Sequence, residues 1–187
     1  MGFFGGKTDM LGLRLVEIWA NVPFLYMVII LVSVMPGWWG VGWQVSSLLF
    51  IMVLFSWTGM TYYIRAAVYK EKARDYVSAA KVIGAGPLRI IFRHLLPNVI
   101  STLVTFAPFT IAAAISSITA LDFLGYGLPP PTPSWGELLK QAVGNLKTAP
   151  WIVISTVSAL VLTLTLVTFV GEAVREAFDP KKFSTYE

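Results

Sequence analysis

A long stretch without charge constrains this chain more than any other feature. No charged residue lies between Glu17 and Arg65, a run that exceeds two membrane-spanning helices of about 20 residues each. Two further uncharged runs cover residues 95–121 and 148–171. Charged residues make up only 13% of the chain, against about 25% in an average soluble domain. The sequence therefore argues against a soluble globular domain and predicts an all-α polytopic membrane protein.

The longest uncharged run contains a break. Pro36 and Gly37 interrupt a helix, and the Trp residues beside them favour the membrane interface. We therefore divide this run into two spans, of which the first is short and contains Asn21 and Pro23. Four transmembrane helices are expected, at about residues 19–35, 44–64, 98–121 and 150–171.

Half of the basic residues lie in one loop, and this sets the expected topology. Seven of the 14 Lys and Arg residues fall within 65–97, so the positive-inside rule places this loop in the cytoplasm. The 122–149 loop then faces outside, and both termini are cytoplasmic. The same bias explains most of the net charge of +4, so no nucleic acid partner is expected. With no Cys and one His, we expect neither a metal site nor a cofactor.

The cytoplasmic loop has the pattern of two short amphipathic helices. Apolar and small residues recur at helical spacing within 73–83. Gly84-Ala85-Gly86-Pro87 follows. Gly is suited to the C-terminus of a helix, and Pro is suited to the first turn of the next helix. A second helix is expected over about 87–95, ended by Pro97. Its predicted apolar side comprises Leu88, Ile91, Phe92 and Leu95, with Arg89 and Arg93 opposite.

Physical reasoning alone leaves two interpretations of this hairpin open. The small residues Ala79, Ala80 and Gly84 leave room for the close approach of another protein surface. A basic amphipathic hairpin equally fits the surface of a lipid bilayer. Arg89 and Arg93 are suited to acidic side chains of a partner protein or to lipid phosphate.

The spacing of the same residues resembles a known pattern. Ala79-Ala80, then Gly84, His94 and Leu96-Pro97, resembles the EAA loop of permease subunits in bacterial ABC importers. Ser78 and His94 depart from the general form of that loop, and both are usual in the dipeptide/oligopeptide subfamily. The Pro-rich segment 123–136 is similar to that subfamily too. The resemblance covers nearly the whole chain, and within the subfamily it points to permeases of microcin C and oligopeptide importers.

The resemblance implies a fold, partners and a location. The fold is that of a type I ABC importer permease, a non-catalytic subunit in the bacterial inner membrane. The implied partners are ATPase subunits, a second permease, a periplasmic peptide-binding protein and a peptide substrate. Full subunits carry additional spans before Gly5-Gly6, so this chain is expected to lack an N-terminal part. The implied ATPase-docking residues of the coupling loop are Tyr76, Ala79, Ala80, Gly84, Arg89, Arg93, His94, Leu96 and Pro97.

A stripe of small and weakly polar residues runs along one side of the third expected span, 98–121. It fits either a path for the peptide or helix–helix packing, and the sequence favours packing. Its members are Asn98, Thr102, Thr105, Ala112, Ser116 and Thr119.

Other classes of membrane protein fit the sequence less well. The expected spans contain no ionisable side chain of the kind that ion-coupled transporters usually place there. No pair of carboxylates or His cluster has catalytic spacing. A permease for a different substrate, a fragment of an ion-coupled transporter and a structural scaffold stay open as alternatives.

Overall fold

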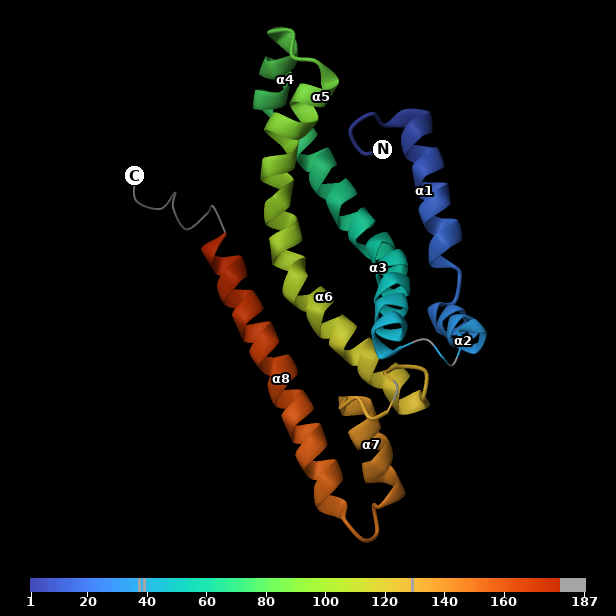
Figure 1. Cartoon of the computed structure of the whole chain (residues 1–187). Coiled ribbons are helices and arrows are strands. Elements are labelled where there is room, and N and C mark those ends of the chain that lie inside the picture. Colours follow the sequence, from blue (N-terminus) through green and yellow to red (C-terminus); the bar gives the residue numbers. More distant parts are fainter. Residues whose placement is uncertain (37, 39, 129, 179–187) are drawn as a thin grey trace. The chain divides into compact units, whose positions relative to one another are not determined.

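The fold consists of helices throughout the part of the chain that can be described. The computed structural model describes residues 1–36, 38, 40–128 and 130–178, and these contain no strand. The all-α prediction is thus confirmed (Figure 1). Gly37 and Pro129, which figured in the sequence argument, lie outside the described residues. The helices are α1 (Gly6–Ala20), α2 (Phe24–Val34), α3 (Val41–Lys72), α4 (Asp75–Val82), α5 (Pro87–Arg89), the π-helix η1 (Ile90–Leu95), α6 (Leu96–Leu124), α7 (Trp135–Gly144) and α8 (Pro150–Ala177).

Three helices of the described chain are long and apolar enough to cross a membrane. They are Val41–Lys72, Pro87–Leu124 and Pro150–Ala177, and three of the four expected spans lie inside them. The range 19–35 instead contains a break, since α1 ends at Ala20 and α2 begins after Pro23. Proline has no N–H to donate, and Asn21 turns its side-chain amide back onto the Glu17 carbonyl at 2.7 Å. If α1 and α2 form one broken span, the number of candidate spans rises to four.

The described chain divides into two compact units. One unit contains residues 1–22, 55–107 and 172–178, and the other contains residues 23–54 and 108–171. The first unit has a small apolar core of Val77, Ala80, Ile90 and Leu95, against which Phe3, Val68, Tyr76 and Ala85 pack.

Two glycines allow close helix packing in the second unit. A Cβ atom added to Gly171 of α8 would lie 2.1 Å from the Pro108 Cβ of α6, so these two helices cross with no room for a side chain. A Cβ atom on Gly136 of α7 would lie 2.3 Å from the Thr119 carbonyl oxygen. Small residues at crossing points are typical of membrane helices, where packing rather than the hydrophobic effect holds helices together.

A buried carboxylate folds the segment after α6 back onto the end of that helix. Asp122 accepts a hydrogen bond from the Leu128 backbone N–H at 2.5 Å, and its side chain leaves no space for a Cβ atom at Gly127. The Ser134 hydroxyl oxygen then caps α7 by accepting from the Glu137 N–H at 3.1 Å. Asp122 thus organises this segment.

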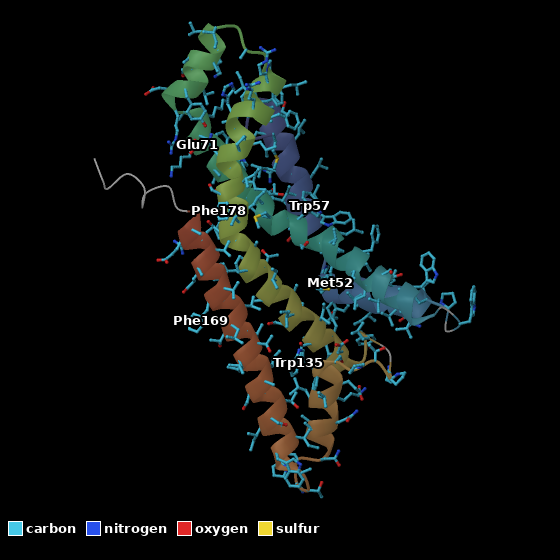
Figure 2. All side chains as sticks on the ribbon, turned by 60° about the vertical axis from the view of Figure 1, so that its left-hand side comes forward. Met52, Trp57, Glu71, Trp135, Phe169 and Phe178 are labelled. Carbon is cyan, nitrogen blue, oxygen red and sulfur yellow. The ribbon has the colours of Figure 1, made fainter. Side chains whose placement is uncertain are left out.

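Large apolar side chains project from every long helix (Figure 2). Trp57 and Phe169, both labelled in Figure 2, are exposed within this chain. A water-soluble monomer rarely exposes so much contiguous apolar surface. These faces therefore suit contact with lipid or with other membrane helices.

Candidate functional site

The 73–97 hairpin turns at a glycine-capped helix end. Helix α4 ends at Val82, and Gly84 follows with φ +82°. The Gly84 N–H donates to the Lys81 carbonyl at 3.0 Å, and the Ala85 N–H donates to the Ala80 carbonyl at 3.0 Å. These two bonds define a Schellman motif, whose left-handed position favours glycine. A Cβ atom at Gly84 would meet nothing within 4 Å, so the requirement is conformational and not steric.

The second half of the hairpin corrects one expectation from the sequence. Pro97 does not end a helix there, because the backbone stays helical from Pro87 to Leu124. The residues just before Pro97 form the π-helix η1, in which the Leu96 N–H donates to the Ile91 carbonyl. An α-helix would bring the proline ring against the carbonyl four residues earlier. The wider π turn shifts that carbonyl, so the helix passes through the proline.

The π turn also changes which side chains face the core. Ile90 and Leu95 are each 2% exposed, whereas Leu88 and Phe92 are 68% and 65% exposed. Of the expected apolar side, Leu95 is thus buried in the core, whereas Leu88 and Phe92 are exposed. A turn of α-helix spans 3.6 residues, and the extra residue in a π turn rotates the following side chains to a different face.

The small pair of α4 divides into one inward and one outward residue. Ala80 belongs to the hairpin's own core and is buried, whereas Ala79 is exposed. A bulky side chain at Ala80 would thus disturb the hairpin itself. Of the two, Ala79 is the one that a docking partner can reach.

The turn of the hairpin presents apolar side chains to its surroundings. Val82 and Ile83 are 87% and 83% exposed, and they stand beside Ala79 and Gly84. We call the residues Val82, Ile83, Leu88 and Phe92 the apolar tip. Exposed apolar clusters of this kind usually mark a contact surface.

Basic side chains flank the apolar tip. Lys81, Arg89 and Arg93 are exposed, and the described residues provide no ion pair to any of them. Arg74 instead pairs with Glu71 at 3.1 Å. An acidic partner surface or a lipid phosphate could therefore take up the charge of Arg89 and Arg93 without breaking an internal contact.

A hydrogen-bond network fixes the base of the hairpin. The Tyr76 hydroxyl donates to Glu71 Oε2 at 2.9 Å and accepts from Asn98 Nδ2 at 3.4 Å. Asn98 also donates to the His94 carbonyl at 2.7 Å, and the His94 ring lies 6.5 Å from that of Tyr76. Burial, followed by the Glu71 carboxylate, raises the pKa of Tyr76 above its usual value. Tyr76 therefore stays protonated and holds α4 to the start of α6, while Leu96 and Pro97 are exposed.

The stripe proposed as a peptide path uses its hydroxyl groups internally. The hydroxyls of Thr105, Ser116 and Thr119 each donate to the carbonyl four residues earlier in α6. Thr119 is buried where α7 packs, whereas Thr102 and Ala112 are half-buried. These contacts agree with packing at the Thr119 end. A path along the remainder of the stripe stays a prediction.

One cluster had no signal in the sequence. Arg65 Nε donates to Asp9 Oδ1 at 2.8 Å, and the Tyr69 hydroxyl donates to Asp9 Oδ2 at 2.8 Å. Asp9 is 5% exposed. Its partner Arg65 lies 56 residues away in the sequence. Among the described residues, no group of three His, Cys, Asp or Glu side chains could hold a metal ion.

Comparison with known proteins covers nearly the whole chain. Residues 1–184 match the family described as binding-protein-dependent transport system inner membrane component. The chain is 44% identical over 181 residues to the peptidoglycan transport system permease protein YejE of Agrobacterium fabrum, covering 97% of this chain and 46% of that protein.

Two further relatives are also described as transport permeases. The chain is 43% identical over 182 residues to the inner membrane ABC transporter permease protein YejE of Escherichia coli, covering 97% of this chain and 51% of that protein. It is 35% identical over 181 residues to the oligopeptide transport system permease protein OppC of Haemophilus influenzae, covering 96% of this chain and 56% of that protein. The chain thus spans about half the length of the curated relatives it matches.

Proposed function

This chain belongs to the family of binding-protein-dependent transport system inner membrane components, and on that premise we propose that it is the coupling part of a peptide permease. In this proposal, partner ATPase subunits hydrolyse ATP and drive peptides inward across the bacterial inner membrane. The observation that carries the proposal is the hairpin, which presents an unpartnered apolar tip on a rigid base. The chain itself holds no catalytic group in this scheme.

The apolar tip is suited to docking in a groove of an ATPase subunit. Val82 and Ile83 project from a glycine-capped turn, which holds them without flexible linkers. Ala79 supplies a small surface beside them, and Arg89 and Arg93 supply charge for acidic groups of the ATPase or for lipid phosphate. Because the tip is joined to α6 by an unbroken helix, a push on the tip would be transmitted along α6.

The partners follow from the same scheme. A second permease subunit would cover part of the apolar faces, and a periplasmic peptide-binding protein would meet the 122–149 loop outside. Both termini of the chain would lie in the cytoplasm, as the Lys and Arg distribution favours. The relatives' names include oligopeptide and peptidoglycan transport, so the substrate class proposed here is peptides, including peptidoglycan fragments and microcin C-like peptides.

Docking is tested by co-purification from the host membrane in mild detergent. The tagged permease containing this chain should retain an ATPase and a second permease. Ala79→Arg should reduce the retained ATPase about tenfold and leave the second permease, because overpacking an interface costs about 1–3 kcal/mol. Asn145→Arg, at an exposed position of the other unit, serves as the matched control. Ala80→Arg is unsuitable, since Ala80 is buried in the hairpin.

The outcomes separate the parts of the proposal. If the ATPase stays with Ala79→Arg, docking through this surface is wrong while the permease assignment stands. If the wild type retains no ATPase, the proposed function is wrong. If the proposed function holds, the reconstituted complex should take up radiolabelled trialanine or a radiolabelled muropeptide only with ATP. Uptake that needs an ion gradient and no ATP would indicate an ion-coupled transporter instead.

A further inference from the structure

Gly2, Phe3 and Asp9 contact the end of α3 that leads into the hairpin. The Lys72 ammonium donates to the Phe3 carbonyl at 2.6 Å and lies 5.6 Å from the centre of the Phe3 ring. A Cβ atom on Gly2 would be 3.5 Å from the Val68 Cβ. Residues 2–5 thus form a turn beside Val68 and Lys72, and α1 begins at Gly6 with Asp9 in its first turn.

Phe3 reaches from this segment into the hairpin. Its side chain packs against the core of Val77, Ala80, Ile90 and Leu95, so α4 and η1 share a contact with the start of the described chain. The ring is therefore a direct link between the hairpin and the residues that lead into α1.

The other end of the segment is held by the buried ion pair. Arg65 and Tyr69 of α3 both bond the Asp9 carboxylate at the beginning of α1. A charged group buried this deeply is strongly destabilising once its partner is removed. The pair therefore fixes the first turn of α1 to α3 only while both charges are present.

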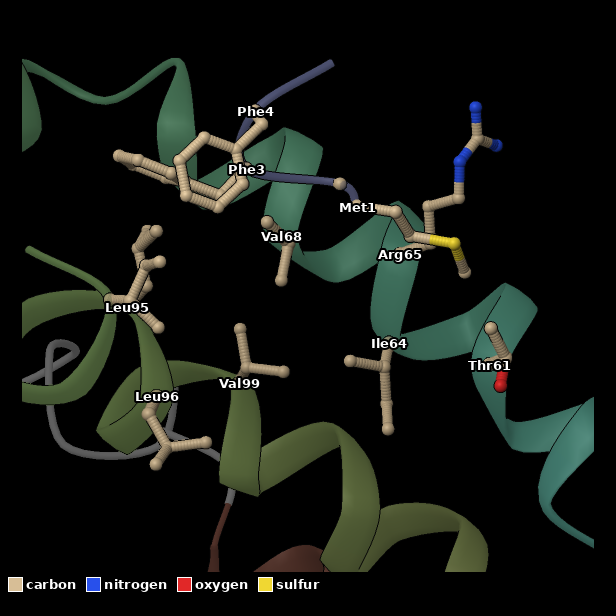
Figure 3. A pocket seen from close by; sticks show the side chains of 12 residues that line it. Met1, Phe3, Phe4, Thr61, Ile64, Arg65, Val68, Leu95, Leu96 and Val99 are labelled. Atoms are coloured by element: carbon tan, nitrogen blue, oxygen red, sulfur yellow. The ribbon is translucent and has the colours of Figure 1, made fainter. Parts of the chain in front are cut away.

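A cavity lies beside the buried ion pair, and Arg65 is among the residues that line it. Its volume is about 320 Å³, and it is lined by the segment, by α3 and by the helix that follows the hairpin (Figure 3). Phe3, Ile64, Val68 and Val99 face it in the close view. The polar contacts of Phe3 with Lys72 and of Asp9 with Arg65 hold the segment on either side of this cavity.

We propose that residues 2–9 are a brace that makes α1 follow the hairpin as one rigid body. Phe3 and Lys72 hold one end of the brace, and Asp9 and Arg65 hold the other. When the ATPase displaces the hairpin, the brace passes that movement to α1, so that α6 is not the sole route from the hairpin. This inference rests on the proposed function, since it assigns a mechanical role within ATP-driven transport.

A disulfide tests the geometry, because this chain contains no Cys. Disulfides need Cβ atoms about 3.5–4.5 Å apart, which Gly2 and Val68 satisfy, so Gly2→Cys with Val68→Cys should form a bond under mild oxidation. In the assembled importer, the oxidised protein should keep ATP-driven uptake of trialanine or the muropeptide. A rigid brace predicts this result, whereas a joint that opens in each cycle would be blocked.

The ion pair is tested by Asp9→Asn. Uptake per ATP hydrolysed should fall about tenfold, a coupling loss within the usual range for linked sites, while the ATPase stays bound. Adding the oxidised Gly2→Cys/Val68→Cys bond should restore the ratio, and reductant should remove the restoration. Arg14→Gln, which breaks only the exposed pair of α1 with Glu17, is the matched control and should change nothing.

Each remaining outcome overturns the inference. Undiminished coupling in Asp9→Asn would show that the pair transmits nothing. Loss of the Asp9→Asn protein from the membrane, or a coupling loss that the disulfide cannot restore, would assign the pair to folding alone. Inhibition by the disulfide in the wild type would make the segment a moving joint. Absence of ATP-driven uptake in the wild type would overturn the proposed function together with the inference.

Discussion

Single residues in the hairpin have roles that their type alone does not reveal. Gly84 and Gly86 lie two positions apart, and neither would bring a Cβ atom within 4 Å of another group. Gly84 has φ +82°, whereas Gly86 has φ −69°. Only the first therefore uses the conformational freedom of glycine, in agreement with the helix end that the sequence predicts there.

This difference predicts opposite effects of alanine at the two positions. Gly84→Ala should destabilise the hairpin by about 1–2 kcal/mol, since an L-residue in the left-handed region is strained. Gly86→Ala should be neutral or stabilising by up to about 1 kcal/mol, because it restricts the unfolded chain. Hydrogen exchange of the Ala85 amide, which bonds to Ala80, measures the local opening. Equal exchange rates in the two variants would contradict a Schellman cap.

Among the helices, the residues at the points of contact decide how two helices pack, and the overall apolar content of each helix does not. The sequence predicts the three long helices of the described chain well. A long uncharged run in a membrane can satisfy its backbone hydrogen bonds in few structures other than a helix. The sequence does not predict that Pro97 continues a helix, because the π turn that allows this depends on the packing of Ile90 and Leu95. Nor does it predict the crossing at Pro108 and Gly171, since the two residues are far apart in sequence.

The crossing predicts that Gly171 is far less tolerant than a glycine on an open helix face. Gly171→Ala should lower stability by about 1–3 kcal/mol, because the new methyl group overlaps the Pro108 ring. Gly59→Ala, in α3 with nothing within 4 Å, should be neutral or stabilising by about 1 kcal/mol through helix propensity. Thermal unfolding in detergent compares the two. A tolerated Gly171→Ala would mean that α6 and α8 do not cross at this point.

At the scale of the whole chain, the sequence defines classes of contact but not pairs of residues. The charge distribution predicts membrane spans and a basic loop, and the motif spacing predicts a coupling hairpin. The Asp9 and Arg65 pair escapes both, because it joins residues 56 positions apart and neither side chain has a local pattern. Asp122 escapes both for another reason, since its partner is the backbone N–H of Leu128, which has no side-chain pattern to detect. Buried polar contacts are therefore the part that needed a structure.

The topology of the chain is open to a direct test, since every thiol introduced into it is unique. Single Cys substitutions at Lys81 in the hairpin and at Thr148 before α8 both fall on exposed positions. Because basic loops stay in the cytoplasm, Thr148→Cys should react with a membrane-impermeant maleimide added to intact spheroplasts. Lys81→Cys should react only after permeabilisation. The reverse pattern would place the hairpin outside, where no ATPase is available, and would overturn the topology and the docking proposal together.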